Sequence, residues 1–447
     1  MGTRKPNAHL DRLHKEAHWT QGQFARSVNA IGTERGTPTA FGESTVHYWR
    51  KGVMPREGVR KLVLEALSLR LGRKISHTDA GFPAPANSAA DVGIVQELIE
   101  LGRLDMDPAR RSVLSAGIFS VGLNIPDWQD ALDRLSLAHD GRVRRIGEGE
   151  IELVTTVTRH LSDLDYQFGG QNTRPTAASF IVNTLAPYLS ASGPTSVRKR
   201  MLSAASDLCY LTGYMAVDEG QQGLGQQYYL KAMELAKSAD DRDAHSLALH
   251  GMSSQALQLG HHETALRLTS AAIADFGSLE PNMRAFLAGQ RAYASALTEG
   301  AAAAFPFLRK AEREMGKADS SSRAVMGHYR EAVLEFDIAQ VKHGLNDTEG
   351  SVQSLKRYTV LQRNRTQRRR SVLDHSTLAE RQLRIGHLEA ACASWSQALK
   401  DYPFVQSGRA DQRMTSMLSA LKPFLRNATA RELHERARAV VKVRHVR

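Results

Sequence analysis

The sequence is poor in cysteine, proline and aromatic residues, and each shortage argues against a class of fold. Its two cysteines, Cys209 and Cys392, lie far apart in the chain, which excludes a disulfide framework and fits a reducing compartment. Each lies in an apolar helical pattern, where we expect a small buried side chain. The 14 prolines and 6% aromatic residues are too few to favour a β-sandwich or barrel.

Long apolar runs are also absent. No stretch approaches the roughly 18 apolar residues that a membrane-spanning helix needs. Residues 1–15 are polar and charged, unlike a secretory signal. The string RRSVLSAG at Arg110–Gly117 imitates a twin-arginine export signal but lies more than a hundred residues into the chain, so we expect it to begin a helix. The sequence therefore predicts a soluble, cytoplasmic protein with no membrane partner.

Residues suited to catalysis or metal binding do not group in any recognisable pattern. His14 and His18 share a helix face, but two histidines without a third ligand are not a metal site. The glycines Gly220, Gly223 and Gly225 lack the preceding strand that a nucleotide-binding loop requires. No nucleophile, base and orienting group occur together. We therefore expect no enzyme activity, no metal and no cofactor.

Helical periodicity dominates what is present. Hydrophobic residues make up 42% of the chain, and Ala-Leu-rich stretches fill its second half, so we predict an all-α protein. A chain of 447 residues is too long for one core. We expect a small helical domain over residues 1–75, a linker with connecting helices over 76–145, which contains Pro83 and Pro85, and a helical repeat domain over 146–447.

Positive charge is concentrated near the N-terminus. The chain carries a net charge of +12, and residues 1–83 hold 14 Lys and Arg against 7 Asp and Glu. Such a concentration on a small domain is the electrostatic signature of phosphate binding. A solvated basic face is the alternative explanation, so the charge alone does not establish a nucleic-acid partner.

Four helices are predicted in the first domain from caps and apolar spacing. Asn7 is a good N-cap, and Thr20 with Gln23 three residues later forms a capping box. Glycines are expected to end the second helix and to border the loop that follows it. The first expected helix follows Asn7, and the second runs from Thr20 to Gly32. After a loop over Gly32–Gly42, the third covers Glu43–Lys51, and the fourth runs from Pro55 to Gly72.

The third predicted helix has an unusually polar surface. Only Val46 and Trp49 are plainly inward-facing, three residues apart. A short helix that offers hydroxyls, an imidazole and two cations to solvent suits the major groove of DNA. The side chains expected to face outward are Ser44, Thr45, His47, Tyr48, Arg50 and Lys51.

The strings TQGQFA from Thr20 and STVHYWRKG from Ser44, with Pro55 shortly after, resemble the Xre/Cro-type helix-turn-helix family over about residues 7–72. The resemblance implies double-stranded DNA as a partner. It places Gln21 and Gln23 near the DNA backbone, Ser44, Thr45, His47 and Tyr48 near base edges, and Arg50 and Lys51 on phosphates. Arg26, and Arg35 at the tip of a longer loop than the family has, complete the expected DNA-binding set. A bundle that only docks a protein partner is the alternative.

Glycines recur at regular intervals in the second half of the chain. Each lies between an Ala-Leu-rich helix and a second amphipathic helix, and self-similarity at intervals of 40 to 44 residues is typical of a solenoid. The pattern resembles the tetratricopeptide repeat (TPR), best at Gly386–Pro403. Such arrays present a concave surface, which implies a peptide or protein effector in the groove, or a homodimer. The glycines are Gly220, Gly260, Gly300, Gly344 and Gly386.

Further amphipathic helices and two basic clusters surround this array. The clusters, Arg363–Arg370 and Lys442–Arg447, are expected to be solvated loops, with a secondary contact to nucleic acid or an acidic partner as the alternative. The further helices are expected near Val92–Leu101, Glu150–Leu164, Pro175–Leu189, Val197–Met215, Gln412–Leu425 and Ala430–Val441.

The combination resembles actinobacterial helix-turn-helix/TPR regulators of development and secondary metabolism. It implies a sequence-specific DNA-binding transcriptional regulator whose repeat array dimerises or binds an effector. A TPR protein-interaction scaffold, whose N-terminal bundle docks a protein, is the alternative function.

Overall fold

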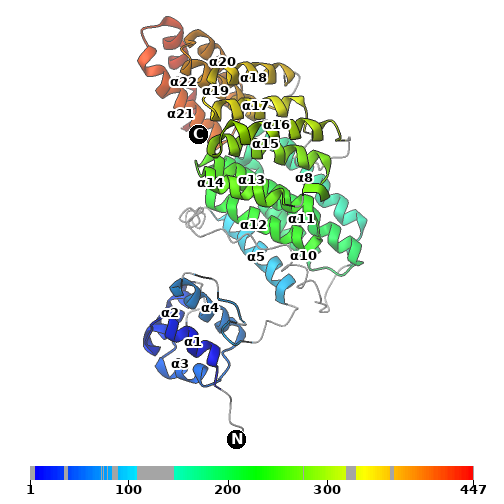
Figure 1. The fold of residues 1–447 in the computed structure, drawn as a ribbon, viewed down its shortest axis with the longest axis vertical. Helices are drawn as coiled ribbons and strands as arrows, with labels where there is room; N and C mark the ends of the chain where they lie inside the picture. Colours follow the sequence, from blue (N-terminus) through cyan, green and yellow to red (C-terminus); the bar gives the residue numbers. More distant parts are fainter. Residues whose placement is uncertain are drawn as a thin grey trace. The chain divides into compact units, whose positions relative to one another are not determined.

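The computed structural model describes most of the chain, as two compact units that lie within residues 1–92 and from residue 93 onward (Figure 1). Within the described residues the ordered elements are helices, which confirms the all-α prediction, and the β-type pairing consists of one isolated bridge between Arg145 and Ser192. The described residues are 6–34, 39–71, 73, 75–77, 79–82, 89–107, 145–274, 276–318, 329–362 and 367–445.

The N-terminal unit contains the four predicted helices. They are α1 (Ala8–Glu16), α2 (Gln21–Glu34), α3 (Glu43–Arg50) and α4 (Glu57–Leu71). The Asn7 side chain accepts a hydrogen bond from the Leu10 N–H (3.0 Å), as an N-cap should. Thr20 and Gln23 form the expected capping box, with each side chain accepting from the other's backbone N–H at 3.2 and 2.8 Å.

The second helix does not end at Gly32, as the sequence predicts. Gly32 is buried inside α2, which continues to Glu34. The loop is held from within the helix instead, because the Asn29 side chain donates to the Phe41 carbonyl and accepts from the Phe41 N–H, both at 2.9 Å. These long-range bonds have no signature in local sequence. Residues 35–38 of the expected loop lie outside the described residues.

The core of this unit extends beyond the expected boundary at residue 75. Ile75, Ala80 and Phe82 are buried with the helices, although their segment reads as part of a polar linker. The Asn7 side chain donates to the Ala80 carbonyl (2.9 Å), so both ends of the unit meet. Three buried residues in a turn-rich stretch are too few to produce a recognisable periodicity.

The second unit begins with helices that precede the repeats. Predicted helices near Val92–Leu101 and Glu150–Leu164 are present but longer, and Pro175 lies inside a helix instead of starting one. The helix begins earlier because the positive φ of Gly169 (+91°) allows a sharp turn directly after the preceding helix. The elements are α5 (Ala89–Met106), α8 (Glu148–Phe168), α9 (Gly170–Phe180), the π-helix η2 (Ile181–Leu185) and α10 (Ala186–Leu189).

Helix pairs of the TPR-like class follow, and Figure 1 shows them in succession from α11 to α22. Both helices expected after residue 411 are present, and the predicted helix over Val197–Met215 is part of α11. The pairs are α11 (Thr195–Asp218) with α12 (Gln222–Ala239), α13 (Arg242–Gln258) with α14 (His262–Ala272), α15 (Pro281–Thr298) with α16 (Ala301–Met315), α17 (Glu331–Gly344) with α18 (Thr348–Leu361), α19 (Arg368–Arg384) with α20 (Leu388–Asp401), and α21 (Gly408–Leu421) with α22 (Ala428–His445). Short 3₁₀ turns, η3 (Phe276–Ser278), η4 (Tyr402–Phe404) and η5 (Lys422–Phe424), join some of them.

The recurring glycines lie where the pattern places them, between the two helices of a pair. Four of them have positive φ values between 79° and 90°, a conformation that costs glycine little. The fifth, Gly344, is instead the last residue of α17, and Asn346 takes the positive φ (+65°). A Cβ on Gly344 would lie 3.3 Å from side-chain atoms of Ala296 and Leu297, so this glycine serves close helix packing.

The last repeats pack against the first helices of the unit. Helix α19 lies against α8, and the Gln406 N–H, just before α21, donates to the Phe168 carbonyl (2.6 Å) at the end of α8. A Cβ on Gly408 would lie 2.8 Å from the carbonyl oxygen of Glu219, so the backbones are in direct contact. The array therefore curves until its later helices meet its earlier ones.

A buried cluster of charged side chains lies where these later helices meet the earlier ones. Arg369 is 1% exposed and donates to Asp165 and Asp218, each at 2.8 Å, from two nitrogens of one guanidinium. Arg409 also donates to Asp218 (2.8 Å). The guanidinium carbons of both arginines lie 5.0 and 5.2 Å from the ring centre of Tyr214, which adds cation–π attraction. The cluster connects α8, α11, α19 and α21.

The expectation of a solvated basic loop is wrong for the described part of Arg363–Arg370. Arg368–Arg370 form the first turn of α19, and Arg369 is buried as above. Arg370 donates to the Tyr358 hydroxyl (2.6 Å) and pairs with Asp374 (3.5 Å). The partners of Arg369 lie more than 150 residues earlier in the chain, so no local pattern reveals them. Arg363 and Arg365 lie outside the described residues.

The two aspartates of the cluster differ in acidity. Burial raises the pKa of Asp165 to about 6, against the attraction of Arg369. Burial also acts on Asp218, but two guanidinium groups, Arg369 and Arg409, outweigh it and hold the pKa of Asp218 at about 2. Asp218 is therefore the permanent negative charge at the centre of the cluster.

We expect the replacement of Arg369 by Met to destabilise the repeat unit by about 3–5 kcal/mol, because it leaves the buried Asp165 without an ion-pair partner and Asp218 with Arg409 alone. Chemical denaturation followed by circular dichroism measures this change. The control is Arg368→Met, in which the neighbouring residue is exposed and only rests on the ring of Phe404. Equal stability of the two variants would contradict the role given to Arg369.

Candidate functional site

The core fixes the orientation of α3 in the N-terminal unit. Val46 is fully buried and Trp49 is 4% exposed, and Phe41 meets the Trp49 ring edge-on with ring centres 5.1 Å apart. Phe24 and Val28 of α2 belong to the same core, as predicted. Helix α3 therefore presents its opposite side to solvent.

Four of the six side chains expected to face outward from this helix region are exposed. They provide a hydroxyl, an imidazole, a phenol and an ammonium group, and Tyr48 is 58% exposed. The rings of His47 and Tyr48 meet edge-on, with centres 5.9 Å apart. Thr45 is half-buried. The exposed set, which we call the α3 surface, is Ser44, His47, Tyr48 and Lys51.

Arg50 does not face outward, contrary to the sequence prediction. Its guanidinium donates to Asp11 of α1 (Nε to Oδ1, 2.7 Å), and Asp11 also pairs with Lys15 (2.9 Å). Hydrogen bonds from Lys15 and Arg50 hold the pKa of Asp11 below its usual value. The Gln21 amide lies between Arg50 Nη1 (3.0 Å) and the Glu43 carbonyl (3.1 Å). Arg50 and Gln21 therefore position α3 against α1 and α2.

The remaining residues of the expected DNA-binding set are on or after α2. Gln23 is exposed, but its side chain accepts from the Thr20 N–H and caps the helix. Arg26 is exposed on the same helix. Arg35 lies outside the described residues. The structure thus brings four of the ten predicted residues together on the α3 surface and assigns a structural contact to Gln21, Gln23 and Arg50.

Two apolar side chains on the N-terminal unit are exposed and were not expected. Met54, in the turn after α3, is 44% exposed, and Leu69 near the end of α4 is 71% exposed. Leu69 lies at the edge of the buried stripe of α4 that includes Leu62, Val63, Ala66 and Leu67, so the helical spacing allows its exposure, whereas Met54 lies in a turn without such a pattern. With Tyr48, they provide contact area for an apolar partner.

The prediction that His14 and His18 share a helix face is wrong, because α1 ends at Glu16 and His18 lies exposed in the turn after it with a positive φ (+50°). His14 is 6% exposed and lies against Phe24, with ring centres 5.7 Å apart, and burial lowers its pKa. Among the described residues, no group of three His, Cys, Asp or Glu side chains is placed to hold a metal ion. Both cysteines, Cys209 and Cys392, are buried, as their apolar surroundings predict.

A second polar cluster lies between α13, α15 and α17 in the repeat unit. The Tyr329 hydroxyl donates to Asp337 (2.6 Å), and the Phe286 ring meets Tyr329 on one side and His250 on the other. Asp337 lies directly against Gly289, where a larger residue would clash. Burial raises the pKa of Asp337 to about 7 and lowers that of His250 to about 4. Burial therefore shifts both groups toward their neutral forms relative to the free side chains.

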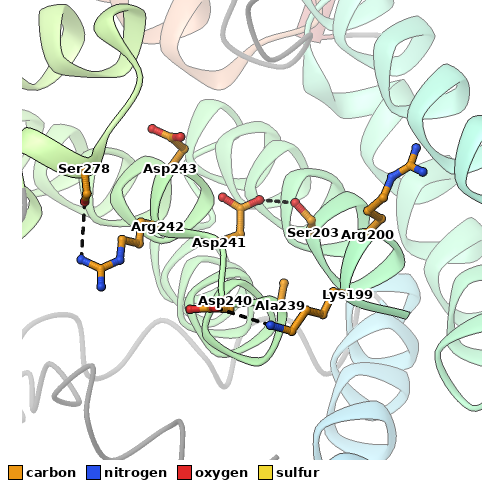
Figure 2. Close-up of a pocket in the computed structure, with 9 residues that line it drawn as sticks. All are labelled: Lys199, Arg200, Ser203, Ala239, Asp240, Asp241, Arg242, Asp243 and Ser278. Carbon is orange, nitrogen blue, oxygen red and sulfur yellow. Dashed lines mark hydrogen bonds and ion pairs between the residues drawn. The ribbon is translucent and has the colours of Figure 1, made fainter. Parts of the chain in front are cut away.

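A shallow depression of about 370 Å³ lies beside the start of α11 and α13 (Figure 2). Its lining side chains interact with one another. Lys199 pairs with Asp240 (3.4 Å), and Arg242 donates to Ser278 (3.5 Å). Asp241 caps α13 by accepting from the Ala244 N–H (2.9 Å). The depression is thus lined by helix caps and local ion pairs, and it does not indicate a ligand class.

The residues described here include no helix that is both long and apolar enough to span a membrane.

A protein-family model described as the SP15 N-terminal domain matches residues 10–83. This span covers most of α1, all of α2 to α4, and the buried segment that ends at Phe82. The matching model is not a helix-turn-helix or Xre family. The resemblance to the Xre/Cro-type family therefore rests on the strings TQGQFA and STVHYWRKG alone. A search of curated proteins finds no match.

Solved structures of IFIT1 give weak matches to the chain. A monomeric mutant with Gppp-AAAA has 12% identity and a TM-score of 0.37, and the match covers 98% of this chain and 91% of that one. A second monomeric mutant, with m7Gppp-AAAA, has 12% identity and a TM-score of 0.34, over 97% and 94% of the two chains. Both scores are too low to carry an argument, and the TPR-like architecture rests on the helix pairs themselves.

We expect Arg50→Ala and Lys51→Ala to differ in their effect on stability, because Arg50 positions α3 whereas Lys51 lies on its exposed surface. Arg50→Ala removes the ion pair between α3 and α1 and should lower the stability of the N-terminal unit by about 1–2 kcal/mol, whereas Lys51→Ala should change it by less than about 0.5 kcal/mol. Thermal unfolding monitored by Trp fluorescence tests this, because Trp19 and Trp49 both lie in this unit. A stable Arg50→Ala variant would mean that the Asp11 contact does not hold α3.

Asp337 should make the repeat unit sensitive to pH. The pKa of its carboxyl group is about 7 in the folded chain and near 3.8 when unfolded, so the unfolded chain releases the proton first. The free energy of unfolding therefore falls from about pH 4 to pH 7. Asp337→Asn cannot titrate, and its stability relative to the parent should rise by about 2–3 kcal/mol between pH 5 and pH 8, at about 1.4 kcal/mol per pH unit.

Urea denaturation of both chains at pH 5, 6, 7 and 8 measures this difference. The control is Asp163→Asn, at an exposed position on α8. Parallel stability curves for Asp337→Asn and the parent chain would show that the folded chain does not bind the extra proton.

Proposed function

We propose that the protein is a sequence-specific DNA-binding regulator whose N-terminal unit places the α3 surface in the major groove of double-stranded DNA. The observation that carries this proposal is the α3 surface itself. It groups Ser44, His47 and Tyr48 of one short helix with Lys51 at its C-cap, and the other side of this helix is fixed in the core. Hydroxyl and imidazole groups can exchange hydrogen bonds with base edges, and a lysine neutralises phosphate.

Charge and local geometry support the same proposal. The excess of Lys and Arg in residues 1–83 favours a polyanion. The capped N-terminus of α2, with Gln23 exposed beside it, adds a helix end whose positive dipole attracts phosphate. Arg26, exposed one turn further along α2, extends the positive surface.

The TPR-like unit is proposed to control this binding by holding a partner. Stacked helix pairs expose surfaces that suit a peptide or protein effector, or a second copy of the chain in a homodimer. The resemblance to actinobacterial regulators suggests a role in development or secondary metabolism, in the cytoplasm. None of these partners is identified by a specific side-chain arrangement.

A protein-interaction scaffold is the second candidate function. It is favoured by the exposed Tyr48 and Met54, which are well suited to a protein partner, and by the family match over residues 10–83, which is not to a helix-turn-helix or Xre family. In this case the N-terminal unit docks a protein, and DNA binding shows no preferred sequence.

Replacing Ser44, Thr45 and His47 together by Ala should abolish sequence preference while leaving salt-dependent binding to random DNA. Each well-made base contact contributes about 1–3 kcal/mol of discrimination, so the affinity ratio between preferred and random duplexes should fall by at least about tenfold. Lys51→Ala should weaken both duplexes alike. The measurement is an electrophoretic shift of the full chain on a duplex selected from a random pool.

The outcomes separate the two candidate functions. Equal loss of preferred and random binding in the triple variant contradicts base reading by α3. Failure to select any preferred duplex favours the scaffold. In that case, a protein partner retained from a lysate by the parent chain should be lost on Tyr48→Ala and Met54→Ala.

A further inference from the structure

The net positive charge of this chain lies at its two ends. Residues 421–447 hold 8 Lys and Arg against 2 Asp and Glu, an excess of 6. With the excess of 7 in residues 1–83, the two ends account for more than the whole net charge of +12. The 337 residues between them hold 37 basic and 38 acidic residues and are nearly neutral. The proposed DNA-binding unit uses only one of the two basic ends.

Most of the second basic end lies on α22, the last helix of the repeat unit. Its apolar residues Ala430, Leu433 and Ala437 are buried in the core of the final repeats. The prediction of a loop over Lys442–Arg447 is wrong for its described part, because α22 continues to His445. The burial of one side leaves the opposite side of α22 in solvent.

Three basic residues form a stripe along the exposed side. Arg431, Arg438 and Lys442 are spaced seven and four residues apart, which puts them within a narrow sector of the helix surface. All three are exposed. We call this set the α22 stripe. Lys422 and Arg426, in the connection before α22, are exposed as well.

Within the described residues no member of the α22 stripe forms an ion pair, in contrast to the buried and half-buried arginines of the same unit. Arg369, Arg409 and Arg413 all pair with carboxylates. Glu435 lies between Arg431 and Arg438 on the same side, yet no ion pair forms. Like charges four residues apart, as at Arg438 and Lys442, destabilise a helix by a few tenths of a kcal/mol.

The helix dipole accounts for only part of this arrangement. Basic residues near a helix C-terminus are favoured, which fits Arg438 and Lys442. Arg431 lies in the first turn of α22, where a positive charge is disfavoured, and Arg426 lies just before the helix. Intramolecular electrostatics therefore do not explain the stripe as a whole.

We infer that the α22 stripe is a second contact surface for the phosphate backbone of double-stranded DNA, separate from the α3 surface. The inference rests on the proposed function in taking DNA as the partner. Eleven residues of helix separate Arg431 from Lys442, or about 16 Å. A duplex carries one charge per roughly 1.7 Å of axis, so the stripe spans about ten phosphate charges.

A duplex fits the stripe better than a lipid surface does. A helix that binds a membrane inserts an exposed apolar side between its basic residues. The apolar side of α22 is already buried against the repeats, and the exposed apolar residues among the described side chains of the helix are Ala428 and Ala439. Phe424, which is 37% exposed, lies in the connection before the helix and outside the stripe. The stripe offers charge without an apolar side chain large enough to insert, which matches sequence-independent phosphate binding.

The test is the salt dependence of binding of the full chain to a random-sequence duplex. Neutralising each phosphate contributes about −0.9 to the slope of log K against log salt concentration. Combining Arg431→Ala, Arg438→Ala and Lys442→Ala should make the slope shallower by about 2–3. At 50 mM salt the affinity should fall at least about tenfold. The affinity ratio between preferred and random duplexes should not change.

The matched control removes three exposed basic residues elsewhere, by combining Arg309→Ala, Arg313→Ala and Lys356→Ala. It should leave the slope nearly unchanged, which excludes a general effect of net charge. Equal slopes for the α22 variant and this control would overturn the inference. So would loss of binding to phosphatidylserine vesicles with an unchanged DNA slope, which would assign the stripe to membranes.

The proposed function and this inference can fail separately. If no preferred duplex exists but the α22 variant still reduces the salt slope, the stripe binds DNA and base reading by α3 is wrong. If the preference for one duplex sequence depends on α3, but the α22 substitutions leave the salt slope unchanged, the proposed function stands without the second surface.

Discussion

The repeat unit depends on the buried ion pairs that Arg369 makes with Asp165 and Asp218. Helix pairs joined only to their neighbours form an open, extensible array. Here a guanidinium from α19 reaches carboxylates of α8 and α11, and Arg409 of α21 adds to the same cluster. Separating buried charges is costly, so the contact is either made or broken as a whole. The curvature of the array is therefore fixed more firmly than nearest-neighbour packing alone would fix it.

The fixed curvature limits which side chains of the repeat unit a partner can contact. Tyr214, Asp337 and His250 are half-buried between helices, and the pKa of each is shifted. Burial raises the pKa of Asp337 and lowers that of His250. Burial of Tyr214 is outweighed by the charges of Arg369 and Arg409, which lower its pKa. A partner that engages these groups has to compete with contacts already made inside the unit. The outer surfaces, by contrast, keep unpaired charge, above all on α22.

Local signals predicted what local interactions determine. The caps at Asn7 and Thr20, the buried pair Val46 and Trp49, and the glycines between paired helices all follow from short-range spacing. Contacts between distant segments were not predictable. Arg369 reads as a solvated charge because its partners are more than 150 residues away. Arg50 is predicted to bind phosphate because its partner Asp11 lies 39 residues earlier in the chain and no local pattern indicates the ion pair. The burial of Phe82 was not predictable because its segment has the composition of a linker.

The meeting of Asn7 with Ala80 has a consequence for how the N-terminal unit could be moved between proteins. Segments near the two ends of the described part of this unit lie side by side, so the unit needs only one point of attachment to a host chain. It could be inserted into a surface loop, or circularly permuted by a short link across that point, without stretching its helices. A fragment that stops at the end of α4 would lack the buried Phe82 and expose the apolar core beneath it.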